Sequence, residues 1–171
     1  MIILGVDPGS LRTGYGAIAS DGRRHQLLEK GVLAPPPAAS LAERLHLIHD
    51  GLASVIARLQ PEALAVEDVF HAVNSRSALV LGHVRGVVLL AGAEAGLPIQ
   101  AYAPATVKVQ VTGYGRAQKA QVALMVERLL GLPGNGEAGD AADALAVALC
   151  GAHHVTRVLV PALPSSRGRG R

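Results

Sequence analysis

The pattern of apolar and polar residues changes once along the chain, from the period of a strand to that of a helix. In the first third, three apolar or alternating segments at 2–7, 13–20 and 23–34 have the pattern of strands. Asp21-Gly22 separates the second from the third, and Asp-Gly between two alternating segments is a strong hairpin signal. The first third therefore predicts an antiparallel meander of three strands.

After Ser40, apolar residues recur every three or four positions, which is the period of a helix. Ser40 and Glu43 form a capping box that predicts a helix start, and Pro61 marks its end. The remaining segments predict strands at 63–70 and 98–103, helices at 75–95, 117–130 and 140–153, and a short helix with a glycine-rich loop between 104 and 115. A meander followed by alternating helices and strands predicts an α/β domain, with a five-stranded mixed sheet flanked by helices on both faces.

Composition supports one domain whose body has no net charge. The chain has 171 residues, half of them apolar but only 2% aromatic, so the core has to consist of Ala, Val, Leu and Ile. The net charge of +3 equals the contribution of Arg167, Arg169 and Arg171 at the very end. This argues against a globally basic protein that coats DNA. We expect residues 1–155 to form the domain and 156–171 a basic, disordered tail.

Several classes of protein are disfavoured. The one cysteine, Cys150, cannot form an internal disulfide, and no Cys/His spacing resembles a zinc site. No apolar run approaches the ~18 residues of a membrane-spanning helix, and the N-terminus has no basic leader of a secretory signal. We therefore expect a cytoplasmic protein without a membrane partner.

Four carboxylates stand in unusually apolar segments. Asp7 follows IILGV, Glu67 follows ALAV, and Asp140 and Asp143 begin an otherwise apolar helix. Each has a structural alternative: Asp7 in a turn, Asp140 as a helix cap, and Glu67 beside a buried arginine. Together they favour a shared site, because strand ends in α/β sheets place ligands at one edge and because basic neighbours are scarce. Converging carboxylates without cations favour Mg²⁺ or Mn²⁺.

The middle of the chain is locally basic. Between 69 and 126 there are five basic residues and one acidic residue, Glu94. The five are Arg76, Arg85, Lys108, Arg116 and Lys119. Acidic metal ligands within basic surroundings suit hydrolysis of a phosphodiester, although the basic residues alone are also compatible with a solvated helix face.

Five segments in this order resemble the RuvC family of crossover junction endodeoxyribonucleases. They are IILGVDPGS-LRTGYG at the start, AVEDVF at 65–70, NSRSALVLGHVRG at 74–86, VKVQVTGYGRAQKAQV at 107–122 and GDAADALAVAL at 139–149. The resemblance implies a ribonuclease H-like fold and an enzyme that resolves four-way (Holliday) DNA junctions in recombination and repair. It implies paired nicks that leave 5′-phosphate and 3′-hydroxyl ends.

The resemblance also assigns residues. It implies that Asp7, Glu67, Asp140 and Asp143 are catalytic and hold two ions of Mg²⁺ or Mn²⁺. Some relatives carry His in place of Asp140. Lys108 and Lys119 match positions that face the DNA backbone, and Phe70 matches an aromatic residue that stacks at the branch; from the pattern alone, Phe70 would be assigned to the core. We add Arg76 and Arg116 as candidate DNA contacts, whereas strand alternation turns Asp68 away from the site.

Paired cutting requires two active sites, so we expect a homodimer with two-fold symmetry. The 75–95 helix is rich in small residues, and Gly82 and Gly86 permit close approach of a second helix. Packing within one chain is the alternative explanation of this glycine pair. Family membership further implies the branch-migration proteins RuvA and RuvB as partners.

Three other functions remain open at this point. They are a junction-binding scaffold without activity, a ribonuclease acting on RNA/DNA hybrids, and a fragment of an actin-like phosphotransfer enzyme suggested by GVDPGS. Metal-dependent nicking of a junction would distinguish a nuclease from the inactive scaffold. Comparing cleavage of a junction with cleavage of an RNA/DNA hybrid would distinguish a junction nuclease from the simple ribonuclease. The third requires a second domain and a further phosphate loop, which these 171 residues do not contain.

Overall fold

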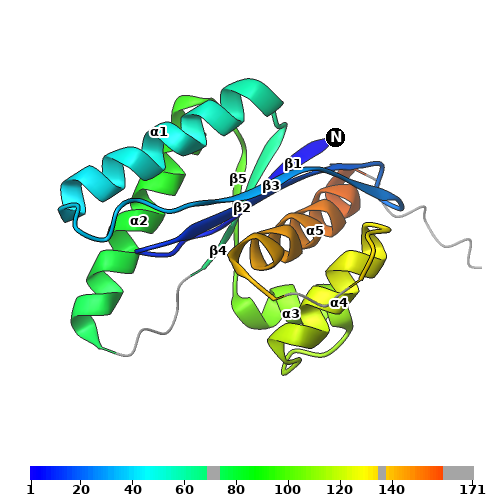
Figure 1. Cartoon of the computed structure of the whole chain (residues 1–171). Coiled ribbons are helices and arrows are strands. Elements are labelled where there is room, and N and C mark those ends of the chain that lie inside the picture. The colour runs from blue at the N-terminus through cyan, green and yellow to red at the C-terminus, as the bar shows by residue number, and fades with distance from the viewer. Residues whose placement is uncertain (69–73, 135–137, 160–171) are drawn as a thin grey trace, which may run out of the picture.

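A computed structural model describes residues 1–68, 74–134 and 138–159, with 155–159 described by their backbone only. It contains a five-stranded sheet in the order β3-β2-β1-β4-β5 (Figure 1). The strands are β1 (Ile2–Asp7), β2 (Thr13–Ser20), β3 (His25–Leu33), β4 (Ala63–Glu67) and β5 (Ile99–Tyr102). β1, β2 and β3 pair antiparallel, while β4 and β5 add in parallel to β1. The predicted meander and mixed sheet are confirmed.

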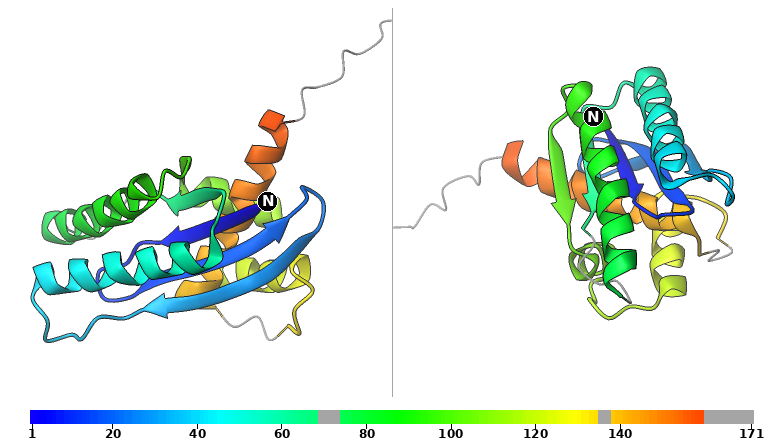
Figure 2. Two further views of the ribbon diagram at one scale, coloured as in Figure 1. Left: turned by 90° about the horizontal axis from the view of Figure 1, so that it is seen from above. Right: turned by 90° about the vertical axis from the view of Figure 1, so that its left-hand side faces the viewer.

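Helices cover both faces of this sheet. α1 (Leu41–Leu59) and α2 (Ser75–Glu94) lie on one face, and α3 (Pro104–Thr112), α4 (Lys119–Leu129) and α5 (Asp140–Leu159) lie on the other (Figures 1 and 2). α1 begins with the predicted capping box, in which the Glu43 backbone N–H donates to Ser40 Oγ and the Ser40 N–H donates to the Glu43 carboxylate. α5 runs to Leu159, six residues beyond its predicted end.

Successive side chains of β1 point to opposite faces of the sheet, so the core consists of two layers. Ile3 packs with α5 residues such as Leu145 and Leu149, whereas Leu4 packs with Ile48 and Leu52 of α1. The central strands are buried on both faces, as expected for a sheet between two helical layers. Their ends carry the polar residues, and this leaves the carboxyl ends of β1 and β4 as the place where a site can form.

α2 differs from the other helices because it is apolar on all sides and yet largely exposed. Leu79 and Leu90 stand on its outer surface. Among the residues that the structure describes, it is the one helix long and apolar enough to cross a membrane, by length and composition only, and 22% of its apolar window is buried. No uninterrupted apolar run marks α2 in the sequence, because His83 and Arg85 interrupt a window that is apolar on average.

Candidate active site

The parallel pairing of β1 and β4 places Asp7 and Glu67 beside each other. The register joins Ile3 to Ala63 and Val6 to Val66, so the next residues, Asp7 and Glu67, end both strands at the same edge. Parallel strands in adjacent positions present their carboxyl ends together. Two acidic residues that are 60 positions apart in sequence thus become neighbours, as the sequence predicted.

A close contact between α5 and β2 brings the other two acids to the same edge. A Cβ atom on Gly14 would lie 2.0 Å from the backbone oxygen of Asp140, so only glycine lets the start of α5 rest against the strand here. Asp143 follows three residues later, and its backbone N–H donates to the Gly139 oxygen at 2.9 Å. Both acids therefore occupy the first turn of α5, where the helix dipole favours negative charge.

Asp7 and Glu67 form a half-buried acidic pair. Burial, and then the negative charge of Asp7, raise the pKa of Glu67 to about 8. Burial also raises the pKa of Asp7, and the side-chain hydrogen bond with Glu67 partly opposes this change. A hydrogen bond between two carboxyl groups requires a proton, so the pair shares one near neutral pH.

Two cations accompany the remaining acids. Lys119 Nζ lies 2.7 Å from Asp143 Oδ2, and Arg12 Nε lies 2.6 Å from Asp140 Oδ2. The hydrogen bond to Asp143 raises the pKa of Lys119, which therefore stays charged. The expectation that the acids converge without cations is wrong, because folding brings Lys119 and Arg12 in from distant parts of the sequence.

The acids open onto a cleft of about 290 Å³ between the sheet edge and α3, α4 and α5. Its polar lining consists of Asp7, Glu67, Asp143, Lys108 and Lys119. Asp140 does not line the cleft but still acts on Asp7 through its charge. Within 1–68, 74–134 and 138–159, no three acidic, histidine or cysteine side chains come close enough to enclose a metal ion as they stand. Side-chain rotation has to complete any metal site here.

A family model described as "Crossover junction endodeoxyribonuclease RuvC" matches residues 3–151. The chain belongs to the RuvC family. It is 52% identical over 165 residues to the RuvC of Halorhodospira halophila, covering 96% of this chain and 98% of that protein. It is 47% identical over 156 residues to the RuvC of Pelotomaculum thermopropionicum, covering 91% of this chain and 95% of that protein.

Solved structures of RuvC have the same fold. The chain matches Thermus thermophilus RuvC with a TM-score of 0.83 and 38% identity, covering 91% of this chain and 96% of that one. The same protein in complex with a Holliday junction substrate matches with a TM-score of 0.85 and 39% identity, over 91% and 94% of the two chains. The yeast mitochondrial resolvase Ydc2, at 14% identity and a TM-score of 0.64, shares the fold.

The other residues expected from the RuvC resemblance have mixed outcomes. Lys108 and Lys119 line the cleft, whereas Phe70 lies outside the described residues. Arg76 is exposed in the first turn of α2, and Arg116 is exposed in the connection between α3 and α4. Neither arginine lines the cleft.

Asp68 points away from the acids, as strand alternation predicts, whereas Arg12 contacts them without having been predicted to. Asp68 turns toward α2, where its Oδ1 lies 3.1 Å from Arg85 Nε, so it is not part of the RuvC acid cluster. Arg12 had one usable signal, which is its place in the loop that leaves the carboxyl end of β1. A loop at that edge of an α/β sheet contributes to the site as readily as the strand ends do.

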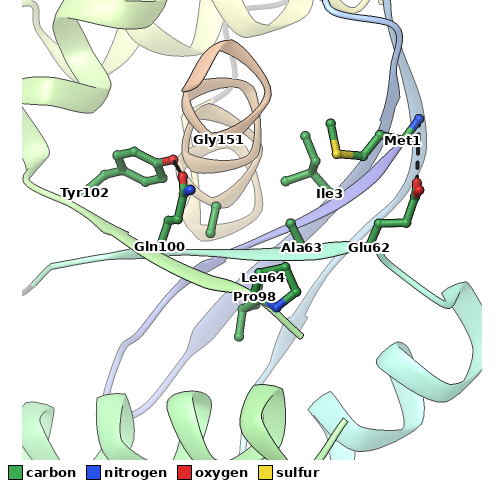
Figure 3. A pocket seen from close by; sticks show the side chains of 10 residues that line it. Met1, Ile3, Glu62, Ala63, Leu64, Pro98, Gln100, Tyr102 and Gly151 are labelled. Atoms are coloured by element: carbon green, nitrogen blue, oxygen red, sulfur yellow. Dashed lines mark hydrogen bonds and ion pairs between the residues drawn. The ribbon is translucent and has the colours of Figure 1, made fainter. Parts of the chain in front are cut away.

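A second pocket, of about 140 Å³, lies at the other end of the parallel strands, away from Asp7 and Glu67 (Figure 3). It is lined by the beginnings of β1, β4 and β5 and by Gly151 of α5, and its walls are mostly apolar. Its polar groups pair with each other, Tyr102 with Gln100 and the N-terminal amine with Glu62. This pocket has no part in the carboxylate chemistry of the RuvC site.

Proposed function

We propose that this protein resolves four-way DNA junctions as a structure-selective, metal-dependent endonuclease that nicks paired strands in recombination and repair. The observation that carries the proposal is the half-buried Asp7–Glu67 pair at the aligned ends of β1 and β4, where burial raises the pKa of both groups and so favours a bound proton or a cation. A binding scaffold has no use for such a pair, because burying two carboxyl groups lowers stability. A metal site does, because a divalent cation takes the place of the shared proton.

The four acids fit Mg²⁺ or Mn²⁺ by chemistry. They supply only carboxylate oxygens, which both ions prefer. Asp7, Glu67 and Asp143 would hold two ions from the cleft and Asp140 from its rim. When bound, such ions lower the pKa of water and offset negative charge on a phosphate.

Lys108 and Lys119 would bind the DNA backbone beside the cut. Both line the cleft, and 71% of the Lys119 side chain is exposed while its ammonium group contacts Asp143. A lysine ammonium binds phosphate as a point charge, and its flexible stem lets it follow the strand. Release of 5′-phosphate and 3′-hydroxyl ends is part of the same proposal.

Phe70, Arg76 and Arg116 would contact DNA farther from the cut. An aromatic side chain stacks on any base and contributes ~1–3 kcal/mol, which suits unpaired bases at a branch. The exposed guanidinium groups of Arg76 and Arg116 suit phosphates of the junction arms. These three roles rest on sequence position.

We place a second copy of the chain on α2, which gives the dimer that paired cutting needs. A Cβ atom on Gly82 or Gly86 would meet nothing within 4 Å, so these glycines do not serve packing within the chain. They line an apolar groove of about 820 Å³ together with Leu79 and Leu90. An exposed apolar face of this kind favours an interface between molecules.

The wider cellular assignments belong to the same proposal. We expect a cytoplasmic protein that works with RuvA and RuvB, the branch-migration partners that family membership implies. Residues 1–155 would form the nuclease domain and 156–171 a basic, disordered tail.

The test is cleavage of a labelled synthetic four-way junction with Mg²⁺ or Mn²⁺ and with EDTA. We expect paired nicks that a ligase can reseal, and none with EDTA. Junction binding without nicking would favour the scaffold. Faster cleavage of an RNA/DNA hybrid than of the junction would favour a simple ribonuclease.

A further inference from the structure

We infer that Arg12 couples metal binding to DNA binding: its guanidinium holds Asp140 while the site is metal-free and moves to a DNA phosphate when cations bind. This inference rests on the proposed function, because it needs Asp140 to be a metal ligand. Arg12 is not among the residues assigned above from sequence or from family resemblance. Its contact with Asp140 joins residues 128 positions apart in sequence.

Arg12 can readily exchange its contact with Asp140 for another anionic partner. Only Nε of Arg12 touches Asp140 Oδ2, at 2.6 Å, and 61% of the Arg12 side chain is exposed. Among the described residues, the two terminal nitrogens of the guanidinium have no hydrogen-bond partner. An exposed ion pair of this type is weak, so releasing Arg12 costs little.

The backbone around Arg12 is fixed, so that only the side chain moves. Thr13 is fully buried, and its hydroxyl donates to the Gly9 oxygen at 3.0 Å. A Cβ atom on Gly9 would lie 2.0 Å from the Arg12 oxygen, which makes the loop tight. The contact of Gly14 with Asp140 then holds the loop against the start of α5.

Electrostatics gives the direction of the change. A cation bound by Asp140 competes with Arg12 for the carboxylate and repels the guanidinium. The released terminal nitrogens form the planar fork that binds a phosphate in bidentate fashion. Metal binding therefore adds a DNA contact, and by linkage DNA binding favours the metal.

A similar ion pair joins Lys119, at the start of α4, to Asp143, which lies in the same turn of α5 as Asp140. Lys119 lines the cleft, where the proposed function puts the reacting phosphate, whereas Arg12 contacts the acid at the rim. We therefore expect Arg12 to bind a phosphate next to the scissile one. It is a positioning residue for DNA that acts through the state of Asp140.

The experiment compares wild type with Arg12→Ala and Arg12→Lys in two binding assays. In the first, loss of the free Mn²⁺ signal in electron paramagnetic resonance gives Mn²⁺ affinity without DNA. We expect Arg12→Ala to bind Mn²⁺ about 3–10 times more tightly, because its competitor is gone, and Arg12→Lys to stay within about twofold of wild type.

The second assay measures junction affinity by fluorescence anisotropy in Ca²⁺ and in EDTA, with a denaturing gel to confirm intact strands. In Ca²⁺ we expect Arg12→Ala to bind about 3–10 times more weakly and its salt slope to fall by about one phosphate contact. In EDTA the loss should be clearly smaller than in Ca²⁺, since the metal-free Asp140 carboxylate then competes with the DNA phosphate for Arg12. Arg23→Ala, an exposed arginine in the turn at the far end of β2, is the control and should change neither affinity.

Opposite changes in the two affinities distinguish this role from a structural one, which would weaken both. Weaker Mn²⁺ binding by Arg12→Ala, or no change in either assay, overturns the inference while leaving the nuclease proposal in place. A wild-type protein that neither binds Mn²⁺ nor cuts a junction contradicts the proposed function itself.

Discussion

Replacing Glu67 by Gln should stabilise the metal-free protein although it removes a residue of the site. In the folded protein the pKa of Glu67 is about 8, against an ordinary value of 4.5 for a glutamate carboxyl group. Because the folded pKa lies above the unfolded one, the folded state binds more protons between these values. The contribution of Glu67 to the free energy of unfolding is therefore fully present below pH 4.5 and is lost as the pH rises toward 8. Gln has no charge to bury and can still donate to Asp7.

The size of the effect follows from the pKa difference. At 1.36 kcal/mol for each tenfold change in proton affinity, the loss at pH 7.5 is at most about 4 kcal/mol. Partial exposure and the shared proton with Asp7 reduce this to roughly 1–3 kcal/mol. For a domain of this size we expect Tm to rise by roughly 3–10 °C at pH 8 and to change little at pH 5.

The assay is differential scanning calorimetry of wild type and Glu67→Gln in EDTA at pH 5 and pH 8. The control is Glu62→Gln, which changes an exposed carboxylate at the beginning of the same strand and should give no gain at pH 8. In the same instrument, Mn²⁺ should raise the Tm of wild type much more than that of Glu67→Gln. A Glu67→Gln protein that melts lower than wild type by equal amounts at both pH values refutes the reasoning.

Three further predictions test other parts of the structure. Asp7→Asn should keep junction affinity within about threefold while abolishing cleavage, measured by anisotropy and by a gel assay, and an active variant would contradict the assignment of Asp7. Gly14→Ala should lower the free energy of unfolding by about 3 kcal/mol or more in urea titrations, since its Cβ would overlap the Asp140 oxygen, whereas unchanged stability would show that α5 shifts freely. Gly82→Arg should leave the fold intact, because the position is open, but give a monomer by sedimentation; a variant that stays dimeric would move the interface away from α2.

Local sequence signals were sufficient for most of the fold. Asp21-Gly22 predicts the hairpin that joins β2 and β3, and the Asp21 carboxylate accepts hydrogen bonds from the backbone of Arg23 and Arg24. The capping box at Ser40 predicts the start of α1 to the residue. Both signals act over three or four residues, and the tertiary structure does not override them.

Side-chain partners across the chain were not predictable in the same way. Asp7 and Glu67 were found because parallel strands align their ends by a general rule. The pairing of Arg12 with Asp140 depends instead on how closely α5 approaches β2, and this is set by the missing side chain of Gly14. The spacing of apolar residues in the sequence contains no information on how closely a helix approaches a strand. The exposed face of α2 was not predictable either. A helix without a distinct polar face gives no indication in its sequence of which side packs on the sheet and which side is exposed.

The most direct measurement of the central idea is the number of protons released when Mn²⁺ binds to wild type. Calorimetric titrations at pH 7 in two buffers of different ionisation enthalpy give that number. A group with a pKa of about 8 is about 0.9 protonated at pH 7, so binding should release close to one proton, and Glu67→Gln should release almost none. Binding of Mn²⁺ without proton release, or no binding at all, would contradict the view that a metal ion replaces the proton shared by Asp7 and Glu67.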